Sequence, residues 1–472
     1  MESGTCGETT HLLDDTLTDL PASPDLLVSL NSPKSNSNPI VEYRLYTSRW
    51  YVLFVFVLLA ASQLCLWNTF GPIADTAKIV LGWTDSDIAL ITSWGCTTFV
   101  LSAFFYSWLM DVKGLKVAVT LGAACLFVGT GIRCLPIPLA YIKWVMHLGQ
   151  IVIGFAGPVM MAAPALLSAT WFPPHQRITS TAIAASASYL GPAVAYLICP
   201  AFVGEVHPSN NSTLYDVDDI DPVVKQHHVD EINTLMYVEF GVMALLFLCV
   251  LIYFPAKPQT PPSPSAHDDR HDFKPGLLIL VKNIHFWLPA LCYSISNGVF
   301  YAWQSQLVLI FKDAQSVGQD TSGWIGFYAN IAGVIGAITF GRLIDHIGPH
   351  GKIKSILIIL VICCIGLALW FGILCLGAIN FNIASLYISV PLYFEMTIEG
   401  MYPVAEGIIT GFMTWLMNLV CLTVLLILMF PSIGVSWMNW AALGGVSVGL
   451  PLLLCYKEEY NRLSLDAYNR LE

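Results

Sequence analysis

The stretch SWLMDVKGLK at residues 107–116 recurs in altered form as GRLIDHIGPHGK at residues 341–352. Each copy closes an apolar run with an aspartate, Asp111 or Asp345, and continues through a glycine-bearing turn and cations into the next apolar run. A carboxylate at such a point can bind the positive N-terminal end of a neighbouring helix. The two copies therefore predict a duplicated chain with two gating carboxylates that hold one side of the molecule closed.

The composition places these loops in a membrane protein. Hydrophobic residues make up 56% of the 472 residues and charged residues only 11%, whereas a soluble domain has about 25% charged residues. Spanning a bilayer takes about 20 apolar residues per helix. Twelve apolar runs are candidate spans, at about 50–73, 87–110, 115–134, 142–170, 178–203, 234–255, 286–311, 322–344, 353–376, 380–398, 406–430 and 436–456. The sequence predicts an all-α membrane protein of two six-helix bundles.

The tenth run is the weakest of the twelve. Asn380, Asn382 and Pro391 interrupt it, and only a few residues separate it from the ninth run. A helix of about 16 residues is marginal for a hydrocarbon core of about 30 Å. We therefore expect a shortened tenth helix.

The runs divide the chain into five segments, and their charges set an orientation. The predicted segments are a disordered tail at 1–48, a six-helix bundle at 49–256, a Pro-rich linker at 257–282, a second bundle at 283–456 and a tail at 457–472. With the N-terminus in the cytosol, 16 of the 21 Lys and Arg residues fall on the cytosolic side. Positive residues favour that side, so both tails and the linker are predicted to be cytosolic.

The longest loop on the opposite side carries two overlapping glycosylation sequons, at Asn210 and Asn211. Such sequons are used in compartments outside the cytosol. They agree with the predicted orientation and predict a glycoprotein.

Several classes of function lack their sequence signals. The net charge of −11 gives no basic surface for nucleic acid. The chain contains no GxxxxGK[ST] loop for ATP, no HExxH and no Cys/His cluster with metal spacing. We therefore expect no enzyme, no metal and no cofactor, and secondary transport with a site between the two halves.

The two repeated loops resemble the signature loop of the major facilitator superfamily, although Ser107 stands where a glycine is usual. Three further stretches narrow the resemblance: WNTFGPI at 67–73, AGP at 156–158 before AAP at 162–164, and WF at 171–172 before QR at 176–177. In register, these resemble the feline leukaemia virus subgroup C receptor-related family, solute carrier family 49.

The resemblance implies a function. The stretches are most similar to the lysosomal branch of the family, which implies proton-driven export of pyridoxine (vitamin B6) to the cytosol by a monomer. The wider family is associated with choline, ethanolamine and haem, so a carrier of these at the plasma membrane is an alternative. A non-transporting membrane receptor or sensor is a third possibility, which a truncated tenth helix would favour.

Polar residues at helical spacing inside apolar runs are candidates for binding a substrate. The candidates are Gln63, Trp67, Tyr189, Asn297, Tyr301 and Asn418. The resemblance places Trp67 and Tyr301 at the aromatic pair that faces a quaternary amine in choline-transporting members. It places Tyr189 and Asn418 where those members have glutamines, which puts choline itself in doubt. Helix–helix packing is the alternative role for all six.

Proton coupling needs a titratable group that the cavity can reach. Glu395 in the tenth run is the preferred candidate, with Glu239 in the sixth and His147 in the fourth as the others. A carboxylate whose pKa is raised could take up a proton from an acidic lumen and release it to the cytosol.

The N-terminal tail carries a sorting pattern. Glu8 lies four residues before the pair Leu12 and Leu13, which fits the acidic dileucine motif [DE]xxxL[LI]. In a cytosolic tail this motif is expected to bind clathrin-adaptor complexes and to direct the protein to the lysosome, whose proton gradient the transport hypothesis requires.

Overall fold

The structure is a computed structural model. It describes residues 44–204, 222–262, 273–305, 310, 319–347, 353–374, 379–428 and 437–468. Every regular element in these ranges is a helix, which confirms the all-α class. The predicted sorting residues Glu8, Leu12 and Leu13 and the sequons at Asn210 and Asn211 lie outside the described residues.

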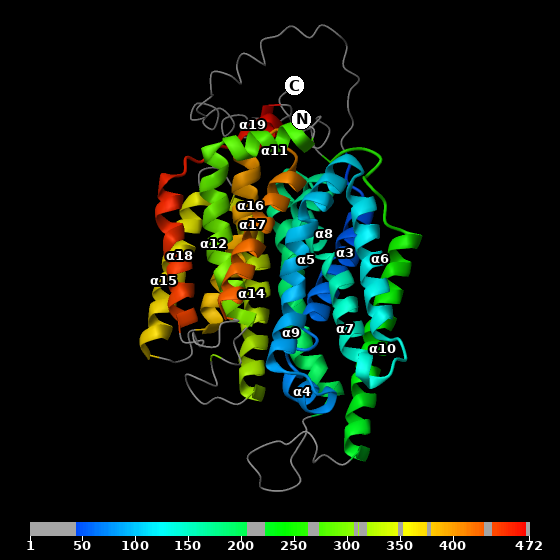
Figure 1. The fold of residues 1–472 in the computed structure, drawn as a ribbon. Helices are drawn as coiled ribbons and strands as arrows, with labels where there is room; N and C mark the ends of the chain where they lie inside the picture. The colour runs from blue at the N-terminus through cyan, green and yellow to red at the C-terminus, as the bar shows by residue number, and fades with distance from the viewer. Residues whose placement is uncertain are drawn as a thin grey trace, which may run out of the picture. The chain divides into compact units, whose positions relative to one another are not determined.

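The N-terminal half holds eight α-helices. They are α3 (Ser48–Trp67), α4 (Ala74–Leu81), α5 (Asp85–Val112), α6 (Leu115–Arg133), α7 (Leu139–Gly154), α8 (Gly157–Trp171), α9 (Arg177–Phe202) and α10 (Pro222–Ile252). The C-terminal half follows with α11 (Phe273–Lys282), α12 (Ile284–Ser305), α14 (Gln319–Ile347), α15 (Ile353–Leu374), α16 (Ile379–Gly400), α17 (Glu406–Leu428), α18 (Trp437–Cys455) and α19 (Asn461–Tyr468). The two halves lie side by side (Figure 1).

A helix lies at each of the twelve predicted runs, with α7 and α8 together forming the fourth. Within the described ranges, nine helices are long and apolar enough to cross a membrane, and the pair α11 and α12, bent by 84°, makes a tenth. Helix α11 falls in the segment that we expected to be linker, and α19 falls in the expected tail. Both were missed because they are short.

The first span differs from the prediction of one helix over 50–73. Helix α3 ends at Trp67, and residues 68–73 form turns before the short helix α4. The Asn68 side chain folds back, and its Nδ2 donates to the Leu64 carbonyl at 2.9 Å. An asparagine that bonds its own backbone in this way competes with helix continuation, and Pro72 follows closely.

The tenth helix is not short, so that expectation is wrong. Helix α16 contains 22 residues, which at 1.5 Å per residue is about 33 Å and enough for the bilayer core. Pro391 lies inside it without ending it. The sensor alternative rested on a truncated helix and loses that support.

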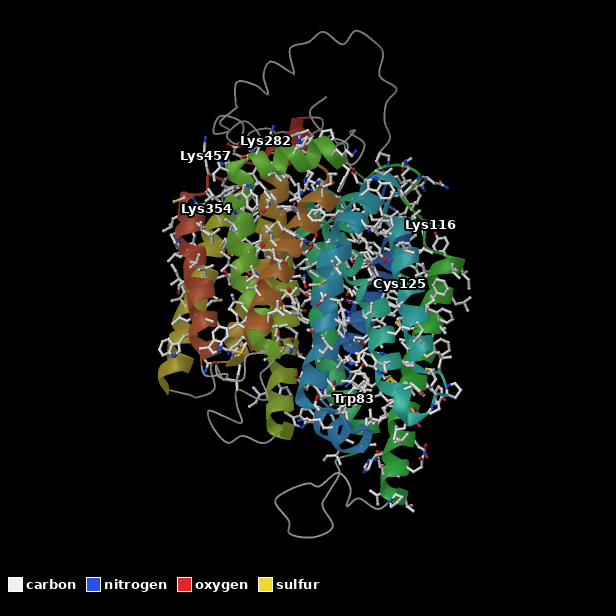
Figure 2. The ribbon with its side chains drawn as sticks, in the orientation of Figure 1. Trp83, Lys116, Cys125, Lys282, Lys354 and Lys457 are labelled. Atoms are coloured by element: carbon white, nitrogen blue, oxygen red, sulfur yellow. The ribbon has the colours of Figure 1, made fainter. Side chains whose placement is uncertain are left out.

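The bundle has two chemically different ends. Lys116, Lys282, Lys354 and Lys457 lie at one end and Trp83 lies at the other (Figure 2). We call these the basic end and the Trp83 end. The two halves meet where α9 packs on α14 and α5 packs on α17. These two helix pairs frame the candidate site.

Candidate functional site

Two polar side chains on α3 are buried without a protein partner. Gln63 is fully buried, and neither its Oε1 nor its Nε2 has a hydrogen-bond partner. Trp67, one turn later, is buried, and its indole Nε1 also has no partner. Burying a polar group without a hydrogen bond destabilises a protein by about 1–3 kcal/mol, as judged from mutational data. In the membrane interior, where water is absent, such groups are therefore unfavourable. The position of Gln63 and Trp67 on one face of α3 makes this face the candidate site for a polar ligand.

The Trp67 ring is held between two glycines. A Cβ on Gly95 of α5 would lie 2.7 Å from Trp67 Cδ2, and a Cβ on Gly157 of α8 would lie 2.7 Å from Trp67 Cζ2. Neither position can carry a side chain without moving the ring. The ring therefore packs closely against both α5 and α8, which restricts its orientation.

Tyr189 and Tyr301 bring the two halves together at the same level. Tyr189 on α9 and Tyr301 on α12 have ring centroids 6.4 Å apart and an interplanar angle of 49°. Helix α9 packs closely on α3, because a Cβ on Gly191 would lie 2.4 Å from the Ala61 carbonyl oxygen. The aromatic pair therefore joins a helix of the N-terminal half to a helix of the C-terminal half, and α9, which carries Tyr189, also packs on α3.

Asn297 and Asn418 are buried on the C-terminal half. The Asn297 Nδ2 donates to the Tyr293 carbonyl at 3.0 Å, and the Asn418 Nδ2 donates to the Thr414 carbonyl at 2.9 Å. Each side chain is thus bonded to its own helix, one turn back.

A sulfur contact connects the two sides of the site. Cys96, which follows Gly95, lies with its Sγ 3.7 Å from the Sγ of Cys421, one turn beyond Asn418. None of the six predicted substrate residues carries a charge. The site therefore offers aromatic faces, one free amide and one free indole N–H. These can bind a flat ring with polar substituents or a cation over an aromatic face.

His147 lies near the Trp83 end, in contact with α5. Its Nδ1 accepts a hydrogen bond of 3.0 Å from Trp94 Nε1, so the ring proton sits on Nε2 and the imidazole is neutral. Nε2 is buried and has no partner. Trp94, which bonds His147, is followed by Gly95, which packs against the Trp67 ring. His147 is therefore connected to Trp67 through residues 94 and 95 of α5.

An ion pair at the same end stays formed in acid. Lys143 Nζ lies 2.5 Å from Asp87 Oδ1. The bond from Lys143, aided by Thr84, lowers the pKa of the Asp87 carboxyl to about 2. The stability that comes from this lowered pKa is present above the usual aspartate range and is lost only as the pH falls through about 2. Asp87 therefore remains ionised at pH 5.

Asp345 binds the start of a helix in the other half. Its Oδ2 accepts from the Thr179 backbone N–H at 2.7 Å and from the Thr179 hydroxyl at 2.5 Å, and its Oδ1 accepts from the Ile178 N–H at 3.3 Å. These are orphan donors in the first turn of α9. Asp111, in the other repeat, is half-buried at the end of α5; its neighbour Met110 lies beside Gly407 at the start of α17.

Glu395 is not open to the site, because it is paired with Arg462. The Arg462 guanidinium of α19 is buried and binds Glu395; its Nε lies 2.9 Å from Glu399 Oε1 and its Nη1 lies 3.6 Å from Glu406 Oε1. Burial acts to lower the pKa of Arg462, but the three carboxylates outweigh it and hold the pKa above its usual value. The segment that we expected to be a cytosolic tail is thus folded onto α16 and α17.

Glu239 is also paired. Its Oε2 lies 3.2 Å from Arg133 Nη1, and its Oε1 accepts from the Thr69 hydroxyl at 2.6 Å. Arg133, Gln150, Glu399 and Arg462 are site residues that the sequence analysis missed. A charged residue inside or next to an apolar run was the available signal for three of them.

A family model described as Major Facilitator Superfamily matches residues 52–424. A solute carrier family 49 member 4 homolog of Xenopus tropicalis is 37% identical over 440 residues, covering 90% of this chain and 94% of that protein. The chain belongs to solute carrier family 49 of the major facilitator superfamily. The choline/ethanolamine transporter FLVCR1 of Felis catus is 25% identical over 397 residues, covering 80% of this chain and 67% of that protein.

Solved structures agree on the fold. The fucose transporter FucP in its outward conformation superposes with a TM-score of 0.62 at 16% identity, covering 86% of this chain and 99% of that one. The proton:xylose symporter XylE superposes with a TM-score of 0.64 at 12% identity, covering 89% and 99%. The resemblance to family 49 that the sequence carried is confirmed, and the chain is a multi-pass membrane transporter.

In the structure, the predicted residues lie in three regions: the junction of the two halves, the Trp83 end and the basic end. Gln63, Trp67, Tyr189 and Tyr301 lie at or beside the junction of the two halves. His147 and Glu239 lie toward the Trp83 end, and Asp345 and Glu395 lie at the basic end, each with the partners described above. In the described residues no group of three or more His, Cys, Asp and Glu side chains could hold a metal ion.

Proposed function

We propose that the protein is a proton-coupled secondary transporter that exports pyridoxine from the lysosome to the cytosol by alternating access. The observation that carries the proposal is the pair Gln63 and Trp67. Their three polar atoms are buried and have no protein partner. Helix α3, which carries them, packs on α9, whose Tyr189 meets Tyr301 of the other half. Pyridoxine is a flat ring with hydroxyl groups, so it can stack on an aromatic face and bond these atoms.

Choline or ethanolamine is the second candidate substrate. The name of the Felis catus relative gives it as a choline/ethanolamine transporter, and Trp67 with Tyr301 offers aromatic faces to a cation. Such a contact contributes about 0.5–2 kcal/mol. The six residues include no carboxylate, so a cation would rely on the rings alone, whereas the free Gln63 amide favours a hydroxylated neutral ring.

The charges at the two ends support the proposed orientation. Lys116, Lys282, Lys354 and Lys457 lie at the basic end (Figure 2), which the positive-inside rule assigns to the cytosol. The segment with both sequons begins after Gly204, whose carbonyl accepts from Thr76 on α4 at 3.1 Å. Helix α4 lies at the Trp83 end (Figure 1), so we propose that this end faces the lumen.

The contact of Asp345 with α9 supports alternating access. It joins the two halves at the basic end through bonds to backbone N–H groups that are open when the halves separate. We propose that Asp345, with Asp111 in the equivalent repeat, closes the cytosolic side and is released during each transport cycle.

The experiment that tests the function is uptake of labelled pyridoxine by cells that carry the protein at their surface. With the luminal side facing the medium, uptake at pH 5 is expected to exceed that at pH 7.5 and that of vector cells. Labelled choline in the same cells is the comparison. Pyridoxine flux equal to vector at both pH values would rule out the proposal, and choline flux alone would favour the second candidate.

The protein can be brought to the cell surface by changing the predicted sorting motif in the N-terminal tail. Leu12→Ala/Leu13→Ala is expected to move the protein from lysosomes to the plasma membrane, because the two leucines are the proposed contacts with the adaptor pocket. Surface biotinylation measures the change. Leu26→Ala/Leu27→Ala, a leucine pair of the same tail, is the control. A double variant that stays in lysosomes would show that Glu8, Leu12 and Leu13 are not the sorting signal.

His147 is the coupling residue that the geometry supports best. Glu395 and Glu239 each bind an arginine, whereas the His147 ring is neutral and has no arginine partner. A second proton must enter at Nδ1 and would break the bond from Trp94, next to Gly95 and the Trp67 ring. The groups that face His147 are Trp83, Trp94 and Trp144, with Asp87 and Lys143 acting on it electrostatically.

We therefore expect His147→Gln to make transport insensitive to pH. The ratio of uptake at pH 5 to that at pH 7.5 should fall to about 1, because the glutamine cannot take up a proton. Asp230→Asn is the control: it removes an exposed carboxylate of α10 that is not among the groups acting on His147, so it should leave the ratio unchanged. A wild-type ratio in His147→Gln would exclude His147 as the coupling residue.

A further inference from the structure

The end of α3 is the part of the candidate site that needs external support. The last four carbonyl groups of a helix have no partner within the helix. Asn68 supplies two bonds here, from its backbone N to the Cys65 carbonyl at 3.0 Å and from its side chain to the Leu64 carbonyl. The Leu66 carbonyl also accepts from the Thr69 hydroxyl at 3.1 Å. The carbonyls of Leu66 and Trp67 both lie where the helix breaks.

Side chains from two other helices bind these two carbonyls. Gln150 of α7 donates from Nε2 to the Leu66 carbonyl at 3.4 Å and to the Trp67 carbonyl at 3.3 Å. Arg133 of α6 donates from Nη2 to the Leu66 carbonyl at 3.3 Å. The backbone on either side of the Trp67 Cα is therefore fixed from α6 and α7.

A third helix fixes the arginine. Glu239 of α10 binds Arg133 Nη1 and also accepts from the hydroxyl of Thr69, two residues beyond Trp67. The side chain of Arg133 is fully buried, and its Cζ lies 5.6 Å from the centroid of the Phe70 ring. A buried charge is tolerated when it is paired and bonded in this way. We call Arg133, Gln150 and Glu239 the α3 clamp.

Helices α6 and α7 pack closely around the α3 clamp. A Cβ on Gly149 would lie 2.7 Å from Arg133 Cγ, and a Cβ on Gly129 would lie 2.9 Å from the Gly149 carbonyl oxygen and from the Ile153 backbone N of α7. The two glycines let α6 and α7 approach until the arginine stem passes between them. The Gln150 amide uses only its Nε2, since its Oε1 is buried without a partner. An apolar side chain would fill the same space without that unsatisfied atom, so the bonds from Nε2 to the end of α3 are the feature that only an amide supplies.

We propose that Arg133, Gln150 and Glu239 are positioning residues that set the height and rotation of Trp67 in the substrate site. They act through the carbonyls of Leu66 and Trp67 and through Thr69, and none of them contacts the substrate. The clamp assigns Glu239 a role other than proton coupling. This inference rests on the proposed function only for the claim that Trp67 binds the substrate; the support of α3 is independent of it.

The test uses the purified full-length protein and needs no substrate in its first part. Hydrogen–deuterium exchange is measured on peptides that cover residues 60–75 in Gln150→Met and Glu239→Gln. Exchange at the last turn of α3 is expected to rise about five- to tenfold in both variants. Gln150→Met removes the bonds from Nε2 to the Leu66 and Trp67 carbonyls, and Glu239→Gln leaves Arg133, which bonds the Leu66 carbonyl, without its charged partner. Glu231→Gln removes a carboxylate from the same helix α10 and is the control, with no change expected in α3.

The second part measures transport. In Gln150→Met the KM for pyridoxine is expected to rise about five- to tenfold with the maximal rate unchanged. In a Trp67→Phe background the same substitution should have a smaller effect, because residues that act through one another are not additive. Glu239→Gln should raise the KM and keep the wild-type ratio of uptake at pH 5 and pH 7.5, and Glu239→Asp should restore part of the affinity.

The outcomes separate the clamp from the proposed function. Unchanged exchange at residues 64–68 in both variants would overturn the clamp. So would a Glu239→Gln protein that loses its pH dependence without any change in α3, because Glu239 would then be a coupling residue. Faster exchange in a protein that moves neither pyridoxine nor choline would uphold the clamp and reject the proposed function.

Discussion

Arg462→Ala is expected to destabilise the basic end of the protein by about 3–5 kcal/mol, the usual cost of leaving a buried charge without its partner. Three carboxylates, those of Glu395, Glu399 and Glu406, converge on this one guanidinium. Without it they repel one another in a buried place. The backbone N–H of Leu463 also donates to Glu399 Oε2 at 2.9 Å, so α19 is expected to detach from the end of α16.

The loss should depend on pH in a defined direction. Arg462 itself stays charged from pH 5 to 8, since its pKa lies above the usual arginine value, and it gives the wild type no pH dependence in this window. In Arg462→Ala, protonation of the three carboxylates removes the uncompensated charge. The fall in melting temperature relative to wild type should therefore be smaller at pH 5 than at pH 7.5.

Three variants separate this effect from a general effect of changing the tail. Lys457→Ala removes an exposed cation from the same segment and should leave the melting temperature within about 1 °C of wild type. Arg462→Lys keeps the charge but cannot bond three carboxylates, so its melting temperature should lie between those of Arg462→Ala and the wild type. Arg462→Met combined with Glu395→Gln and Glu399→Gln should recover most of the loss. An Arg462→Ala protein as stable as Lys457→Ala would contradict the ion cluster.

The positions of the spans could be predicted from the sequence because hydropathy alone decides them. A long continuous apolar run satisfies its backbone in lipid by forming a helix. A helix therefore lies at each of the twelve runs, although the fourth is divided into α7 and α8. The breaks could not be predicted in the same way. The end of α3 depends on Asn68 bonding Leu64 and on contacts from α6, α7 and α10. The length of α16 was underestimated because Asn380 and Asn382 were taken as interruptions, although a helix accommodates both.

Among the site residues too, those with a local sequence signal could be predicted, and those that depend on distant partners could not. Gln63 and Trp67 were found because polar residues one turn apart in an apolar run stand out locally. The partners of Glu239 and Glu395 were not found, since Arg133 is 106 residues from Glu239 and Arg462 is 67 residues from Glu395. Arg462 had been counted only as a positive charge in a tail. The same guanidinium becomes a buried partner only when α19 folds onto α16, which no local pattern records.

The second large effect is expected at Trp67. Trp67→Ala should abolish measurable pyridoxine transport, a fall of at least about 100-fold, because truncating a buried aromatic anchor costs about 3–4 kcal/mol of binding free energy and each 1.4 kcal/mol is tenfold. The indole supplies a ring face and an unpaired N–H to the site, and both are lost. Uptake by the surface-redirected protein measures the change, after normalisation to the amount of protein at the surface.

Milder variants at the same place keep this prediction testable if Trp67→Ala folds poorly. Trp67→Phe retains one aromatic ring and loses the N–H together with part of the ring face. It should fold and raise the KM by at least about tenfold, of which one hydrogen bond of about 1–1.5 kcal/mol accounts for most. Gly157→Ala leaves Trp67 in the chain but places a Cβ 2.7 Å from its ring. Gly157→Ala should impair transport because the Trp67 ring must move to make room for the new Cβ.

Gly241→Ala is the matched control for the glycine variant, because a Cβ there would meet nothing within 4 Å and the residue lies in a membrane helix as Gly157 does. It should transport like the wild type. If Gly157→Ala and Gly241→Ala are equally active, the orientation of Trp67 does not matter to transport. If Trp67→Phe also keeps the wild-type KM, the indole N–H does not bind the substrate, and the free Gln63 amide alone would have to account for recognition of a hydroxylated ring.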